Sequence, residues 1–169
     1  MKPAGVVLAI ALAFALETTL TRFIRVLPAV DLLLVVVVYV ALTSGPVTGL
    51  LAGAVAGLVQ DYGLSNGVIG IGGLSKTIVG FLAGIVGTQF IVAEPFPRVV
   101  VFFGATVLHQ VVSIGLSVLL DLRSFGTPYA TVAGEALENA TIGVVWFHLA
   151  ERLPGALERR RAAKTRIRR

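Results

Sequence analysis

Residues 32–60 read LLLVVVVYVALTSGPVTGLLAGAVAGLVQ, a stretch that contains no charged side chain. It is longer than the range of about 17–25 residues that a single membrane-spanning helix occupies. Proline lacks a backbone N–H and restrains the residue before it, so Thr43-Ser44-Gly45-Pro46 predicts a tight turn. The stretch therefore predicts a hairpin of two short helices, at about Ala29–Leu42 and Val47–Gln60.

Four further segments are apolar enough to form membrane helices. They are Pro3–Leu20, Leu74–Val92, Val99–Leu120 and Tyr129–Leu149. The glycine-rich segment Asp61–Gly73 predicts a loop at the interface or one that dips back into the protein, whereas Glu94–Arg98 and Asp121–Pro128 interrupt the helical pattern. We expect an all-α membrane protein, a compact bundle of about six transmembrane helices in residues 1–153, followed by a basic tail in residues 154–169.

The composition supports a membrane protein, because 56% of the residues are hydrophobic and only 14% are charged. A soluble domain carries about 25% charged residues, so most of this surface must face lipid. The absence of cysteine excludes disulfides, thiolate metal sites, a cysteine nucleophile and a lipoprotein anchor. Met1-Lys2-Pro3 and the apolar run after it resemble a signal peptide. A single lysine makes a weak charged region, so we expect a first helix that is retained.

The basic residues predict the orientation in the membrane through the positive-inside rule. Lys2, Arg98 and the eight Lys/Arg from Arg152 onward would share one side, ten in all, whereas Arg22, Arg25 and Arg123 would lie on the other. Both termini are therefore expected in the cytoplasm of a multi-pass protein. If residues 29–60 formed one broken span instead, the N-terminus would lie outside.

Glycines four residues apart provide the strongest packing signal. They are Gly49, Gly53 and Gly57 in one expected helix and Gly80 and Gly84 in the next. Such glycines line one helix face and let a neighbouring backbone approach closely. We expect them to pack within the bundle; the alternative is that one stripe faces a partner helix.

Several polar residues fall inside the expected helices. Lys76 and His109 lie in the fourth and fifth, and Glu135 and Glu138 lie three residues apart in the sixth, on one face. Ionisable groups in lipid normally face the interior and pair. We therefore expect Lys76 to neutralise Glu135 or Glu138, with His109 nearby, either as a structural ion pair or cavity lining or as a proton or ligand site.

The sequence shows no arrangement typical of an enzyme, and we expect no cofactor and no metal. His109 and His148 have no carboxylate spaced to make a metal motif with them, and Gly70-Ile71-Gly72-Gly73 follows no strand. The net charge of +5 is concentrated in residues 152–169, which disfavours nucleic acid as a ligand. The tail is expected to lie against anionic lipid, or to dock a cytoplasmic partner.

The order of these features resembles a known family. Pro28-Ala29-Val30-Asp31-Leu32-Leu33-Leu34 resembles the P-x-x-D-L-L-L entry of the bacterial rod-shape-determining MreD proteins. A Gly-Pro turn follows, then a glycine-rich helix that ends at Leu58-Val59-Gln60-Asp61, a loop over Ser65–Gly70, and Gly80-Phe81-Leu82-Ala83-Gly84. Each of these is similar to a segment of that family.

The resemblance implies a non-enzymatic inner-membrane component of the cell-elongation machinery. Its partners would be an MreC-type single-span protein, and also MreB, RodA and a penicillin-binding protein. Asp31 and Asp61 fall on acidic positions of the family's motifs, at the outer ends of the second and third expected helices. They would serve either as helix-end caps and interfacial charge or as residues that order the outer loops for a periplasmic partner. Whether the chain forms a homodimer within a larger complex is left open.

The resemblance also supplies an alternative function. The family is similar in overall fold to the substrate-binding subunits of energy-coupling-factor vitamin transporters. A vitamin site would need hydrogen-bonding and aromatic groups, and this chain has a single tryptophan, Trp146. A third class, a proton-coupled carrier, would rest on Lys76, His109, Glu135 and Glu138 alone.

Overall fold

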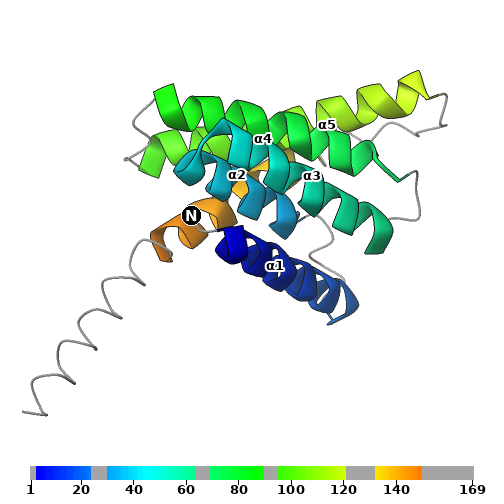
Figure 1. The fold of residues 1–169 in the computed structure, drawn as a ribbon, viewed down its shortest axis with the longest axis horizontal. Coiled ribbons are helices and arrows are strands. Elements are labelled where there is room, and N and C mark those ends of the chain that lie inside the picture. Colours follow the sequence, from blue (N-terminus) through cyan, green and yellow to red (C-terminus); the bar gives the residue numbers. More distant parts are fainter. Residues whose placement is uncertain (1–2, 24–29, 64–68, 90–94, 121–131, 150–169) are drawn as a thin grey trace, which may run out of the picture.

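The computed structural model describes residues 3–23, 30–63, 69–89, 95–120 and 132–149. Six helices and no strands occupy these residues (Figure 1). They are α1 (Pro3–Phe23), α2 (Leu32–Ser44), α3 (Pro46–Gly63), α4 (Ile71–Gln89), α5 (Pro95–Leu119) and an unlabelled sixth helix over residues 132–149. The all-helical prediction is confirmed for this part of the chain.

The helix bounds agree with the predicted ones to within a few residues, and the Gly45-Pro46 turn separates α2 from α3 as expected. Gly45 has φ +89°, a conformation that favours glycine. The start of α5 was predicted wrongly, at Val99 rather than Pro95. Proline is tolerated in the first turn of a helix, because the N–H that it lacks would have no intrahelical acceptor there.

The fourth helix also begins earlier than predicted, at Ile71. The middle of the expected Asp61–Gly73 loop, the predicted turn at Asp121–Pro128 and the tail at 154–169 lie outside the described residues. The division at residue 153 therefore stays a prediction.

The short helix α2 lies at the centre of the bundle, packed against α1, α3, α4 and α5 (Figure 1). Its residues 33–38, 40 and 41 are all buried. A helix that is hydrophobic on every side can be enclosed by protein or surrounded by lipid, and here the burial shows that neighbouring helices enclose it. Two core clusters meet on it, one shared with α4, α5 and the sixth helix and one shared with α1 and α3.

The predicted glycine stripes form a close contact between α3 and α4. A Cβ atom added at Gly49 would overlap the carbonyl of Gly80, and one added at Gly53 would overlap the carbonyl of Lys76. Gly57 meets the backbone of Gly72 and Gly73 in the same way, and Gly84 meets Pro46. These glycines therefore pack within the bundle, as expected.

The outer surface carries large aliphatic side chains. On α3, Val47, Leu51, Val55 and Leu58 are 48–68% exposed on the face away from the glycines. Among the described helices, α4 and residues Phe96–Leu119 are long and apolar enough to cross a membrane, whereas Ala4–Thr19 and Leu32–Ser44 are apolar but shorter. The prediction of six spans stays a prediction.

Candidate functional site

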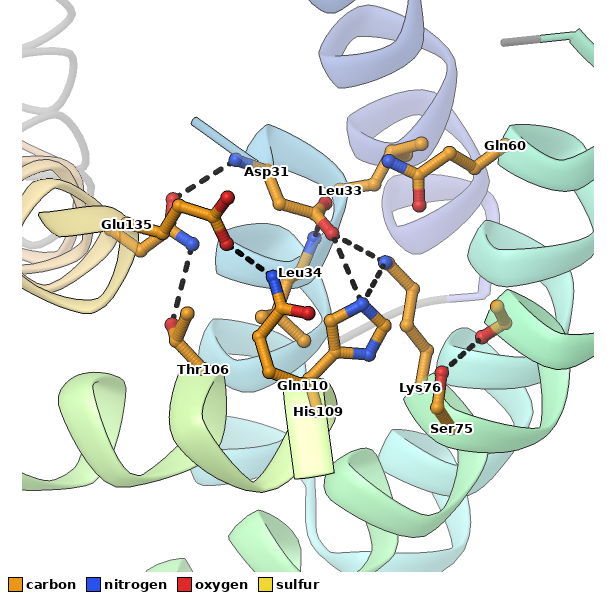
Figure 2. A network of polar contacts seen from close by, with 12 residues as sticks. Asp31, Leu33, Leu34, Gln60, Ser75, Lys76, Thr106, His109, Gln110 and Glu135 are labelled. Atoms are coloured by element: carbon orange, nitrogen blue, oxygen red, sulfur yellow. Dashed lines mark hydrogen bonds and ion pairs between the residues drawn. The ribbon is translucent and has the colours of Figure 1, made fainter. Parts of the chain in front are cut away.

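Asp31, at the start of α2, joins three helices (Figure 2). One carboxylate oxygen accepts a hydrogen bond from the Leu34 N–H at 2.7 Å, which caps α2. The other oxygen lies 2.5 Å from Nζ of Lys76 on α4. The Asp31 N–H donates to the side-chain oxygen of Asn139, on the sixth helix, at 3.0 Å.

The partner of Lys76 is therefore Asp31, and the prediction that Lys76 pairs with Glu135 or Glu138 is wrong. Its side chain is only 1% exposed, so its ammonium group needs a paired anion close by. The amide of Gln110 on α5 donates to Glu135 instead, and Glu138 lies on the exposed face of the sixth helix. A spacing of three residues places two side chains near each other but does not fix which of them turns inward.

His109 lies next to the ion pair, as predicted. Its Nε2 is 3.4 Å from Nζ of Lys76 and 3.8 Å from the nearer carboxylate oxygen of Asp31 (Figure 2). An ammonium group only donates, so Nε2 of a neutral imidazole accepts from Lys76 and the ring proton lies on Nδ1. The Nδ1 atom is buried and has no hydrogen-bond partner among the described residues.

Glu17 forms a second buried polar group, which the sequence analysis did not identify. It is 6% exposed on α1 and accepts hydrogen bonds from the Gln60 side chain at 2.7 Å and from the Leu33 N–H at 3.2 Å. The first turn of α2 therefore receives two carboxylates, Glu17 and Asp31. A carboxylate at a helix N-terminus is favourable because the free N–H groups and the helix dipole are positive there. The position of Glu17 at the end of the apolar run of α1 was the sequence signal that could have indicated a buried acid.

Asn139 extends the polar contacts toward α5. It is buried, and its amide donates to the Thr106 hydroxyl at 3.3 Å. Together with the Gln110–Glu135 contact, this bond joins the sixth helix to α5. We call Glu17, Asp31, Lys76, His109 and Asn139 the polar core.

Asp61 lies outside the polar core and caps α4. Its carboxylate accepts from the Gly70 N–H at 2.8 Å and from the Gly73 N–H at 3.1 Å. Gly70 has φ +111°, a backbone conformation that glycine adopts without a steric cost. Asp31 therefore caps α2 and Asp61 accepts from N–H groups at the start of α4, whereas a role of either residue toward a partner stays a prediction.

The contacts of the polar core pair charged groups with one another and cap helix ends. Within the described ranges no three His, Asp or Glu side chains are grouped so that they could hold a metal ion. The polar core satisfies helix ends and buries an ion pair, so its evident effect is to fix how α1, α2, α4, α5 and the sixth helix sit against one another.

Comparison with known proteins gives one family. No curated protein and no solved structure matches the chain. The similarity to energy-coupling-factor subunits therefore stays a prediction. The family model described as rod shape-determining protein MreD matches residues 3–151. This match covers most of the 169-residue sequence and includes the polar core, the glycine contacts and all six helices, so the chain belongs to the MreD family of rod shape-determining membrane proteins.

Proposed function

We propose that this protein is a non-enzymatic scaffold of the bacterial cell-elongation machinery, and that it holds an MreC-type single-span protein in the cytoplasmic membrane. The family supplies the role in rod-shape determination. The observation that carries the scaffold is the polar core, in which the ionisable groups of separate helices pair with one another or cap α2. A carrier needs such groups free to exchange partners, whereas a scaffold needs them to hold a fixed arrangement of helices.

The proposal includes a multi-pass topology with both termini in the cytoplasm. The ten basic residues expected on that side, against three on the other, support this orientation. MreB, RodA and a penicillin-binding protein would then be reached through the same assembly. Peptidoglycan synthesis would be the process served, and the chain itself would perform no chemistry.

The vitamin-transporter alternative is not favoured. The family match is to shape-determining proteins. In addition, a hollow of about 210 Å³ beside α2 is lined by aliphatic residues and Trp146, without the set of hydrogen-bonding groups that orients a vitamin.

Copurification tests the proposal. The tagged chain, coexpressed with the MreC-type protein of the same bacterium, is extracted in mild detergent and the bound fraction is probed for that protein. We expect the two to be recovered together, whereas an unrelated tagged multi-pass protein should recover none. Absence of the MreC-type protein, from a preparation that elutes as a folded single species, would contradict the scaffold role.

A further inference from the structure

The sixth helix carries an exposed stripe that includes a carboxylate. Glu138, Thr141, Val145, Trp146 and Leu149 are all exposed, at the three- and four-residue spacing of one helix face. Glu138 makes no hydrogen bond or ion pair with any described residue, in contrast to Glu135, which receives Gln110. A carboxylate on the outer face of a membrane helix is costly, and such residues mark functional sites.

Two hollows meet along this stripe. One, of about 370 Å³, is lined by Val30, Leu137, Glu138, Thr141 and Ile142. The other is the apolar hollow of about 210 Å³ described above, and Ile142 lines both. The two hollows therefore lie next to each other along the sixth helix, between Glu138 and Trp146, over about 12 Å or just over two helical turns. We call this pair of hollows the Glu138 groove.

The opposite wall of the groove is α1, and α2 forms part of its floor. Gly5, Ala9 and Ala13 of α1 line it, together with Leu32, Val35 and Val36 of α2. In Figure 1 the orange end of the sixth helix lies beside the first turns of α1. On the α1 wall these small residues alternate with Leu8, Leu12 and Leu16, so the wall is apolar throughout and is hollowed only between the leucines.

We propose that the Glu138 groove binds the transmembrane helix of the partner protein, and that a lysine or arginine on that helix pairs with Glu138. This inference rests on the proposed function and adds the surface and the chemistry of recognition. The groove is apolar along its length and acidic near one end, so its complement is an apolar helix with one basic side chain at the matching depth.

A second copy of this chain is the competing occupant of the groove. Lys76 and Arg98 are the basic residues whose side chains the structure describes, and both are buried. Among the described residues, therefore, no exposed basic side chain could meet Glu138 of a neighbouring copy.

Site-specific photocrosslinking identifies the occupant. The photoreactive amino acid p-benzoylphenylalanine is placed at Thr141 in the groove or at Val111 on α5, which is 60% exposed outside it. The chain is coexpressed with the MreC-type protein and irradiated in cell membranes. We expect an adduct with the MreC-type protein from position 141 and none from position 111. An adduct with a second copy of the chain, or lipid adducts alone, would overturn the proposal.

Two substitutions test the groove by copurification. Ile142→Trp fills the junction of the hollows, and Glu138→Gln removes the charge while it keeps the shape. Because loss of one member of a close charge pair weakens binding strongly, we expect each to reduce the recovered MreC-type protein by about tenfold or more. Val111→Trp is the matched control and should bind as the unmodified chain does.

The same experiment separates the two proposals. If the unmodified chain recovers no MreC-type protein, the proposed function fails. If it does recover that protein, but Ile142→Trp and Glu138→Gln recover it equally well, only the groove assignment fails. A single elution peak at unchanged volume checks that each variant is folded.

Discussion

The two ends of α2 are held by different kinds of contact. At its first turn, Glu17 and Asp31 accept from backbone N–H groups, and Asp31 also pairs with the buried Lys76. Toward its last turn, the Tyr39 ring meets Phe147 of the sixth helix edge to face, with ring centroids 5.1 Å apart. The guanidinium of Arg98 lies 3.9 Å over the same Phe147 ring.

The two kinds of contact differ in how strictly they fix the arrangement of the helices around α2. A buried charge that loses its partner is strongly unfavourable, so the charged end permits few alternative arrangements of the helices. Aromatic and cation–π contacts are weaker and more tolerant of small shifts. The charged end therefore specifies the arrangement, and the aromatic end adds packing to it.

The largest effect is expected from Lys76→Met, which breaks the charged end. It leaves the Asp31 carboxylate without its cation, and loss of one partner of a buried pair costs about 3–5 kcal/mol. The thermal midpoint of the purified protein in detergent, measured from the folded peak that remains after heating, should fall markedly.

The double variant Lys76→Met with Asp31→Asn is the control for that result. The double variant removes both charges, and asparagine can still cap α2. Its loss of stability should therefore be smaller than the sum of the losses in the two single variants. Strictly additive costs would contradict direct pairing.

A smaller effect is expected from Gly53→Ala, which tests whether α3 holds Lys76 in place. The added Cβ atom would overlap the Lys76 carbonyl and the Thr77 Cα atom. Overpacking of this kind costs about 1–3 kcal/mol. The readout is again the thermal midpoint.

Gly104→Ala, on α5, is the matched control for the glycine variant. A Cβ atom at Gly104 meets nothing within 4 Å, and alanine favours a helix over glycine by about 1 kcal/mol. This variant should be neutral or slightly stabilised. If both glycine variants lowered the thermal midpoint equally, Gly53 would not be required for the close contact between α3 and α4.

The smallest effect is expected from Phe147→Leu, at the aromatic end. It removes the edge-to-face contact with Tyr39 and the ring beneath Arg98, for a loss of about 1 kcal/mol. Phe96→Leu, at a position that is 76% exposed, should leave the thermal midpoint unchanged. If Phe147→Leu lowered the thermal midpoint as much as Lys76→Met does, the ranking of the two ends would be contradicted.

The sequence predicted the helices well, because apolar runs and the Gly45-Pro46 turn are local signals. It also predicted the glycine contacts, since glycines four residues apart on two consecutive helices, here α3 and α4, favour close packing of those helices. The uninterrupted apolar run from Leu32 to Val38 predicted a helix, but it did not show whether protein or lipid would surround that helix.

The ion pair could not be predicted in the same way. Asp31 and Lys76 lie 45 positions apart, and their contact depends on how α2 and α4 rotate about their axes. In the sixth helix, Glu135 and Asn139 turn inward together with the small residues Ala136 and Ala140, and this rotation carries Glu138 to the outside. Hydrophobicity alone does not determine that rotation, because all faces of this helix carry apolar residues.

The enclosure of α2 also has a consequence for how this sequence can vary. Its 13 residues span about 20 Å, less than the hydrocarbon thickness of about 30 Å, and protein rather than lipid surrounds them. Lipid accepts any aliphatic side chain, so exposed positions such as Leu51 and Val55 on α3 should exchange freely among Leu, Ile, Val and Phe. Val37 and Val40 have no exposed surface, and their neighbours fix both volume and shape. Among homologues, substitutions should therefore be restricted in size along α2 and restricted only in polarity along the outer faces.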